Sequence, residues 1–162
     1  MTPAPPAPAN VILIGMPGAG KSTVGVLLAK RLSRRFVDTD LLLQAEAGRP
    51  LAGILAAEGL AGFLAREERC LLGLREAGCV IATGGSAVYS AAAMRHLKRQ
   101  GLTVYLFAPA ALLRQRLADL DARGVIRTPG QTLEQLLAER RSEEHTSELQ
   151  SQFHLVCRLL LE

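Results

Sequence analysis

Residues 11–22 read VILIGMPGAGKS, an apolar run that passes directly into a glycine-rich segment. The four aliphatic residues predict a buried strand, and the chain after Lys21 has the apolar spacing of a helix. This is the GxxxxGK[ST] pattern in the context it requires, between a strand and a helix. Glycines let backbone N–H groups curl around a polyphosphate, and the helix points its positive end at the same charge. The stretch predicts a nucleoside triphosphate site; a turn that merely joins a strand to a helix is the alternative.

The residues of this turn have separate predicted roles. Lys21 is expected to reach the β- and γ-phosphates, and the Ser22 hydroxyl is expected to ligate Mg²⁺. The backbone and side chains around them complete the phosphate cradle. The predicted nucleotide-binding residues of the turn are Gly18, Ala19, Gly20, Lys21, Ser22 and Thr23.

The composition indicates a single domain with a core of ordinary size. The 162 residues carry a net charge of +4, and only 4% of them are aromatic, with no Trp. A small anionic substrate explains the scattered basic residues as well as nucleic acid does, and few aromatics are available to stack on bases. Three cysteines without metal-ligand spacing, Cys70, Cys79 and Cys157, indicate reduced thiols in a cytoplasmic protein. No apolar run is long enough for a bilayer, and residues 1–10 predict a flexible tail.

Apolar periodicity predicts an alternation of strands and helices. Strands are predicted at residues 11–15, 36–38, 79–82 and 102–107. Helices are predicted at residues 20–33, 40–47, 51–58, 60–77, 89–99, 109–120 and 132–140, with a mobile loop at 121–131. Strands separated by helices imply a parallel sheet of the α/β class, with ligands at the carboxyl ends of the strands.

The unusual polar residues fall at those strand ends. Asp38-Thr39-Asp40 follows the second strand, and Thr83-Gly84-Gly85 follows the third. Two carboxylates one residue apart repel each other unless a cation lies between them, and Mg²⁺ beside the triphosphate is the natural candidate. One acid can then hold the metal while the other deprotonates an acceptor hydroxyl. The alternative role for Asp40 is to cap the helix that follows it.

Five segments resemble shikimate kinases in identity, order and approximate spacing. They are GMPGAGKST at residues 15–23, DTD at 38–40, GFLAREE at 62–68, ATGG at 82–85 and the strand with Tyr105-Leu106. The resemblance covers residues 11–140 and implies one ATP-dependent kinase domain that phosphorylates a small hydroxyl-bearing acid. Shikimate is the expected acid. It also implies a P-loop NTPase-type parallel sheet flanked by helices, with a lid loop that closes over the site.

The resemblance implies further site residues. Ser22 and Asp38 would hold Mg²⁺, and Asp40 would contact the acceptor hydroxyls and act as the base. Gly84 and Gly85 would let the substrate approach the backbone, and Arg140 would grip its carboxylate. Lys21 and the lid arginines would neutralise the charge that develops during transfer.

The chain departs from the family pattern at three places. Leu64 stands where the family has an arginine that helps to bind the shikimate carboxylate, and Arg66 lies about 200° away around the helix. Ser86 replaces the third glycine, so its hydroxymethyl group either crowds the pocket or donates a new hydrogen bond. The lid lacks the usual Arg-Pro, which leaves Arg123 or Arg127 as the catalytic arginine, and Arg116 is a further candidate near the nucleotide.

Residues 141–162 form a separate case. The run from Arg141 to Ser151 resembles the translation of a sequencing adapter, and the remaining residues do not resemble the family's ending. We therefore expect this tail to lie outside the fold, the family's last strand and helix to be missing, and the edge of the fourth strand to be open. A genuine helical tail is the alternative.

Two other functions compete with the phosphorylation of shikimate. They are a divergent kinase for another small hydroxyl metabolite and an inactive nucleotide-binding fragment. We expect the protein to be a monomer.

Overall fold

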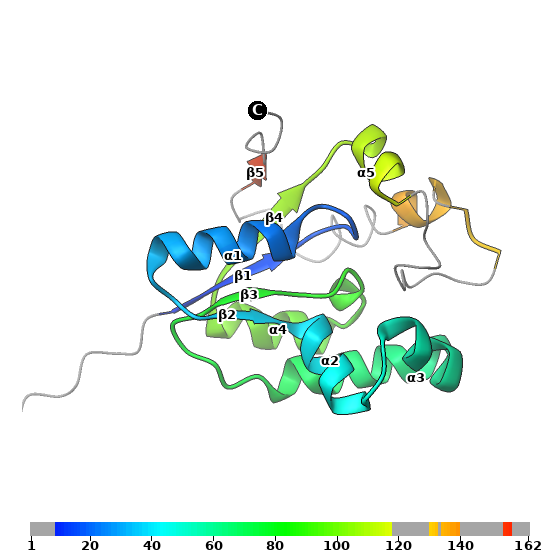
Figure 1. Cartoon of the computed structure of the whole chain (residues 1–162), viewed down its shortest axis with the longest axis horizontal. Helices are drawn as coiled ribbons and strands as arrows, with labels where there is room; N and C mark the ends of the chain where they lie inside the picture. Colours follow the sequence, from blue (N-terminus) through cyan, green and yellow to red (C-terminus); the bar gives the residue numbers. More distant parts are fainter. Residues whose placement is uncertain (1–8, 118–129, 133, 140–153, 157–162) are drawn as a thin grey trace, which may run out of the picture.

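Five strands form one sheet in the order β2-β3-β1-β4-β5, and every neighbouring pair is parallel (Figure 1). The computed structural model describes residues 9–117, 130–132, 134–139 and the backbone of 154–156. The strands are β1 (Asn10–Ile14), β2 (Phe36–Asp38), β3 (Val80–Ala82), β4 (Gly101–Phe107) and β5 (His154–Val156). The helices are α1 (Lys21–Leu32), α2 (Thr39–Ala47), α3 (Leu51–Gly73), the 3₁₀ helix η1 (Ala87–Tyr89), α4 (Ala91–Gln100) and α5 (Ala110–Arg116). Residues 134–139 form one more helix.

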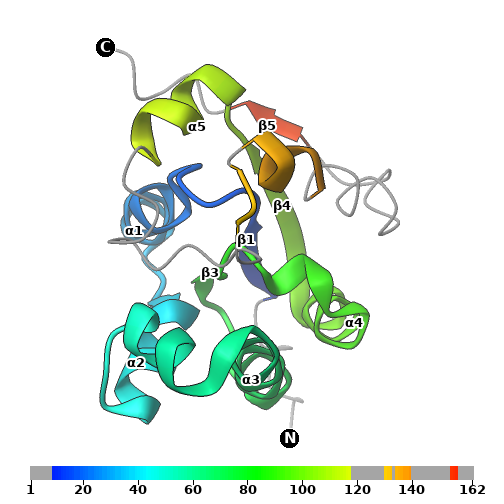
Figure 2. The ribbon, with the colours of Figure 1, turned by 90° about the vertical axis from the view of Figure 1, so that its right-hand side faces the viewer.

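Helices cover both faces of the sheet, which confirms the predicted α/β architecture (Figure 2). Along β1, Leu13 packs into the apolar cluster that contains Leu113 of α5, while Ile12 and Ile14 pack with residues of α3 and α4 on the other face. All three side chains are 0–1% exposed. The central strand is thus apolar on both sides because helices bury both, as expected for a parallel sheet.

A third apolar cluster fixes the helices near the end of β2. Leu43 of α2 packs with Ile54 and Phe63 of α3, and Leu64 lies half-buried against the same group. Gly59, with φ 68° and ψ 179°, interrupts the helical backbone inside α3. The predicted boundary between two helices at this position is therefore confirmed, although the two segments run on without a loop.

Three predicted helix boundaries are wrong. Helix α3 ends at Gly73 and not at residue 77, since Leu74 turns to an extended backbone and is buried. The segment predicted as a helix from residue 89 begins instead as η1, and α4 starts after Ser90. The Ser90 side chain accepts a hydrogen bond from the backbone N–H of Ala93 and so caps α4. The α5 helix ends at Arg116, and residues 118–120 of its predicted extension lie outside the described residues.

The edge of β4 is not open, contrary to the expectation from the sequence. The β5 backbone pairs with it in parallel, with Tyr105 opposite His154 and Phe107 opposite Val156. This pairing satisfies backbone groups that an edge strand would otherwise expose. Residues 141–153 and 157–162 of the predicted tail lie outside the described residues. Within the described part of the chain, no helix combines the length and apolar character that a membrane crossing requires.

Candidate functional site

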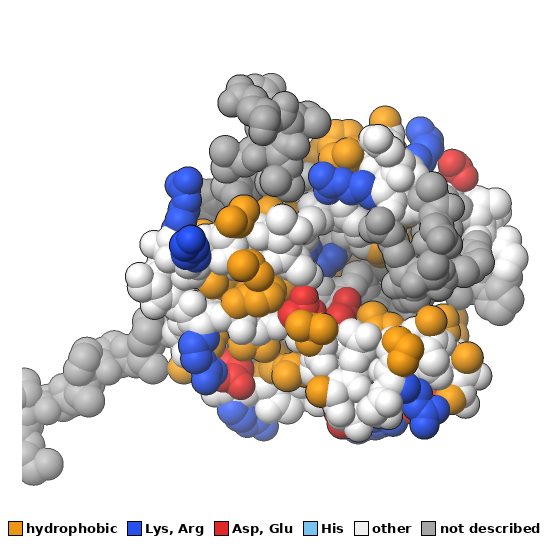
Figure 3. Space-filling view, in the orientation of Figure 1, with side chains coloured by type: hydrophobic (Ala, Val, Ile, Leu, Met, Phe, Trp, Pro, Cys, Tyr) orange, Lys and Arg blue, Asp and Glu red, His pale blue; other side chains and the backbone are white. Residues whose placement is uncertain are grey.

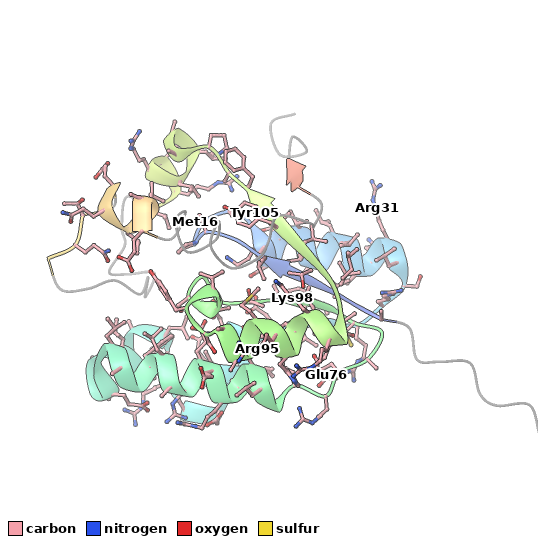
Figure 4. All side chains as sticks on the ribbon, turned by 180° about the vertical axis from the view of Figure 1, so that it is seen from behind. Met16, Arg31, Glu76, Arg95, Lys98 and Tyr105 are labelled. Atoms are coloured by element: carbon pink, nitrogen blue, oxygen red, sulfur yellow. The ribbon has the colours of Figure 1, made fainter. Side chains whose placement is uncertain are left out.

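The glycine-rich turn joins β1 to α1 at the carboxyl end of the sheet. Gly15 has φ +136°, and a Cβ atom at this position would lie 2.6 Å from the backbone oxygen of Leu106 in β4. Gly20 precedes α1 in the left-handed region with φ 92°. Both positions therefore require glycine. Figure 4 labels Met16, which follows β1, and Tyr105 of the neighbouring β4, which pairs with Ile14 of β1.

The Lys21 ammonium lies within this loop. Its Nζ donates hydrogen bonds to the backbone oxygens of Gly15 at 2.7 Å and Met16 at 2.9 Å, and the side chain is 8% exposed. Because the loop carbonyls hold the cation, its charge is fixed at the N-terminus of α1, where the helix dipole is also positive. The arrangement suits a polyphosphate, as the sequence predicted.

Ser22 and Asp38 meet across the start of α1 and the end of β2. The Ser22 hydroxyl donates to Oδ2 of Asp38 at 2.6 Å, while Oδ1 of Asp38 accepts from the backbone N–H of Asp40 at 3.0 Å. Asp38 is therefore the N-cap of α2, and the capping role considered for Asp40 is wrong. A hydroxyl and a carboxylate beside a phosphate loop are ligands that suit Mg²⁺, which takes one or two protein oxygens and completes its shell with phosphates and water.

Asp40 is half-buried in the first turn of α2. Burial raises the pKa of its carboxyl group, the negative charge of Asp38 raises the pKa further, and Lys21 opposes both effects. A carboxylate with a raised pKa next to a phosphate-binding loop is a candidate general base. Figure 3 shows acidic side chains gathered between α1 and α2, at the rim of a hollow.

Gly84 lies directly against two carboxylates. A Cβ atom at this position would come within 2.2 Å of Oε1 of Glu67 and 2.8 Å of Oδ1 of Asp40. The backbone N–H of Gly84 donates to the Thr39 hydroxyl at 3.1 Å, and Thr39 is fully buried. The loop after β3 is thereby attached to the start of α2, and the absence of a side chain at Gly84 makes room for both acids.

Glu67 also lies in the candidate site. It belongs to the segment 62–68 that resembles the family, but the sequence predicted no role for it. It is 2% exposed, and its Oε2 accepts a hydrogen bond from Ser86 at 2.5 Å. Of the two effects considered for Ser86, the structure thus shows a new hydrogen bond. Helical spacing could have indicated Glu67, because it lies four residues from Phe63 and from Leu71, both buried on the same face of α3.

The wall that α3 contributes carries no cation at the position where the family has arginine. Leu64 packs against the apolar cluster of α2 and α3. Arg66 points away, since its guanidinium bonds to Glu58 at 2.6 Å and to Glu46 at 2.7 Å on the surface. These ion pairs are consistent with the expectation that Arg66 does not replace the family arginine, which stays a prediction.

Arg116 brings α5 to the phosphate loop. Its Nη1 donates to the backbone oxygen of Gly18 at 3.0 Å, and a role of Arg116 near the nucleotide stays a prediction. The lid arginines Arg123 and Arg127, and Arg140, lie outside the described residues. No group of three His, Cys, Asp or Glu side chains in the described ranges could enclose a metal ion by itself.

A parallel sheet with helices on both faces, a phosphate loop after its central strand and an aspartate pair beside that loop defines a P-loop kinase fold. The shikimate kinase family model matches residues 17–155. The chain belongs to the shikimate kinase family.

Individual relatives agree with this assignment. The shikimate kinase of Psychrobacter cryohalolentis is 42% identical over 121 residues, which are 74% of this chain and 65% of the relative. The chain thus spans about two thirds of the length of the curated relatives it matches. The solved shikimate kinase of Acinetobacter baumannii, in complex with shikimate, has a TM-score of 0.77 and 36% identity over 86% of this chain and 80% of that one. The enzyme of Aquifex aeolicus has a TM-score of 0.72 and 31% identity over 86% and 83%.

Proposed function

We propose that this protein transfers the γ-phosphoryl group of ATP to a hydroxyl group of shikimate. The observation that carries the proposal is the position of Asp40. Its carboxylate lies against Gly84, and the positive charge of Lys21 in the phosphate loop partly offsets the rise in its pKa that burial causes. A base and a phosphate cradle on the same edge of the sheet can bring an acceptor hydroxyl in line with the γ-phosphate. The similarity to a shikimate kinase solved with shikimate supports this acceptor.

The proposed roles follow from the contacts in the site. Lys21 and the backbone of residues 18–23 bind the phosphates, while Arg116 holds α5 beside them. The hydroxyl oxygen of the acceptor forms a bond to the γ-phosphorus, and Asp40 accepts the hydroxyl proton. At the same time the bond between the γ-phosphorus and the β,γ-bridging oxygen breaks, and ADP leaves. Electrostatic stabilisation and positioning supply most of the rate enhancement in such a reaction. Arg123 and Arg127 are the proposed lid arginines, and Arg140 with Gly85 completes the acceptor site.

Mg²⁺ is the proposed metal of this reaction. It would be held by Ser22 and Asp38, whose oxygens lie 2.6 Å apart beside the phosphate loop. When bound, the ion neutralises phosphate charge. The protein itself fixes both ligands: α1 presents the hydroxyl, and the cap of α2 orients the carboxylate.

The proposed setting is a monomer in the cytoplasm that acts on a small molecule and not on nucleic acid or a membrane. Within the described residues, Cys70 and Cys79 are free thiols, which agrees with a reducing compartment. Aromatic side chains that could stack on bases are scarce, since the chain has two Tyr, four Phe and no Trp.

One observation favours a second candidate function, the phosphorylation of another small hydroxyl compound. Leu64 offers the acceptor no positive charge, so a carboxylate substrate loses one charge-assisted contact, which is worth roughly 1.5–3 kcal/mol. Restoring the family residue with Leu64→Arg provides a direct comparison. This variant should lower the KM for shikimate if that compound is the acceptor.

A coupled assay of ADP release with shikimate, gluconate and homoserine as acceptors tests the proposal. We expect release that depends on shikimate and on Mg²⁺, and that disappears in Asp40→Asn. Turnover of gluconate or homoserine with none on shikimate would reject the named acceptor. ATP binding without transfer to any acceptor would support the nucleotide-binding fragment.

A further inference from the structure

Arg66 joins three helical segments through ion pairs on the surface of the protein. Its Nη2 donates to Oε1 of Glu58 at 2.6 Å, its Nε donates to the same oxygen at 3.1 Å, and its Nη1 donates to Oε1 of Glu46 at 2.7 Å. Glu46 lies in the last turn of α2. Glu58 lies in α3 directly before the break at Gly59, and Arg66 lies in α3 after it. Because the donors of a guanidinium form a rigid planar fork, one side chain fixes all three segments relative to one another.

The break in α3 makes this contact possible. Side chains meet on a regular helix at spacings of three or four residues, whereas Glu58 and Arg66 are eight residues apart. Gly59, with φ 68° and ψ 179°, turns the chain between them. A Cβ atom at Gly62 would lie 2.8 Å from Cβ of Glu58, so glycine at this position leaves the space that the Glu58 side chain occupies. The two glycines thus let the carboxylate reach the guanidinium.

The segment that Arg66 holds carries the proposed base. Residues 39–58 comprise α2 and the part of α3 before Gly59, and Asp40 lies in the first turn of α2. Helix α2 lies beside α3 in both ribbon views (Figures 1 and 2). The segment packs on the rest of α3 through the apolar cluster around Phe63 and through the ion pairs of Arg66. Since apolar packing has no preferred direction, the ion pairs add the directional constraint.

The two ends of α2 are held by different contacts. At its start, Asp38 and Thr39 bond to α1 and to the loop after β3. Near its other end, Glu46 bonds to Arg66, whose side chain is only 20% exposed and is therefore partly shielded from water and salt. A helix held at both ends cannot swing about its first turn, where Asp40 lies.

We propose that Arg66 is a positioning residue for the transfer reaction: by holding Glu46 and Glu58 it fixes α2 so that Asp40 faces the acceptor hydroxyl. The inference rests on the proposed function, in which Asp40 is the base. A displacement of the base by about 1 Å is enough to slow such a reaction strongly. Arg66 acts through α2 and not by contact with a substrate, because its guanidinium bonds to the two acids on the surface.

The chain offers a matched control on the same helix. Arg69 is exposed and its charge also lowers the pKa of Glu58, but it makes no hydrogen bond or ion pair within the described part of the chain. Arg66→Gln and Arg69→Gln therefore remove the same charge from α3, and only the first removes the fork. Glu46→Gln weakens the connection to α2 alone.

Hydrogen exchange of the α2 amides tests the positioning without turnover. Arg66→Gln and Glu46→Gln should speed exchange at residues 41–47 by roughly three- to fivefold, the effect expected of exposed ion pairs, and Arg69→Gln should not. In the assay of ADP release, kcat/KM for shikimate should fall by a similar factor in Arg66→Gln, with the KM for ATP unchanged. In the Glu46→Gln background, Arg66→Gln should add less than it does in the wild type, because both changes act on one contact.

Three results would overturn the inference. They are unchanged exchange in Arg66→Gln, an equal acceleration in Arg69→Gln, and faster exchange in Arg66→Gln with the kcat/KM for shikimate of an active wild type. If the wild type fails to phosphorylate shikimate while exchange in the variants changes as expected, the proposed acceptor is wrong and the role of Arg66 in fixing α2 stands.

Discussion

Gly84→Ala should damage both stability and acceptor binding, because the new methyl group has no space. It would lie 2.2 Å from Oε1 of Glu67, whereas ordinary contact begins at 3.4 Å, so this carboxylate must move by about 1.2 Å. Oδ1 of Asp40, at 2.8 Å, must also withdraw. Overpacking of this kind costs roughly 1–3 kcal/mol, which corresponds to a drop in Tm of about 3–9 °C for a domain of this size.

The same displacement should slow the reaction. A shift of about 1 Å in a positioned group can cost on the order of 10²-fold in rate, so kcat/KM for shikimate should fall by about that factor. Thermal unfolding and coupled ADP release measure the two effects. The control is Gly73→Ala, where no atom lies within 4 Å of the new Cβ, and which should leave activity unchanged. A Gly84→Ala protein with the Tm and kcat/KM of the wild type would refute the crowding argument.

Three further predictions concern the metal, the base and the nucleotide. Ser22→Ala removes a proposed Mg²⁺ ligand and the hydroxyl that orients Asp38, so the Mg²⁺ concentration for half-maximal activity should rise at least about tenfold; an unchanged Mg²⁺ titration would contradict this. The pKa of Asp40 is raised, and a general base must be deprotonated to act. As the pH is lowered, kcat/KM should therefore begin to fall at a pH above the ordinary aspartate pKa of about 3.9; a fall with an apparent pKa at or below that value would refute the assignment. Arg116→Ala should raise the KM for ATP roughly tenfold and leave that for shikimate unchanged, and equal effects on both would indicate a general loss of structure.

Much of the site was predictable from local sequence. The run from Val11 to Ser22 specifies its own strand, turn and helix, and the structure follows it to within one residue. Asp38 ends β2 and Asp40 follows it in the first turn of α2, so the parallel topology brings both to the edge that carries the phosphate loop. Gly59 also divides α3 where the sequence predicts a boundary.

The features that sequence reasoning missed depend on contacts between distant segments. Glu67 is buried because Ser86 and Gly84, 19 and 17 residues away, provide a hydroxyl and an open space. Asp38 and not Asp40 caps α2, because the carboxylate of Asp38 already faces Ser22 and reaches the backbone N–H of Asp40 from there. The pairing of β5 with β4 likewise joins residues 49 positions apart, Tyr105 and His154, which local periodicity cannot indicate.

The most direct test of the central claim is a crystal structure of this protein with MgADP and shikimate. The account predicts the β-phosphate within the loop of residues 15–22, Mg²⁺ beside Ser22 and Asp38, and a shikimate hydroxyl within hydrogen-bond distance of Asp40 on the side that faces the phosphate. Shikimate bound with its ring hydroxyls away from Asp40, or a nucleotide bound outside the loop, would contradict it.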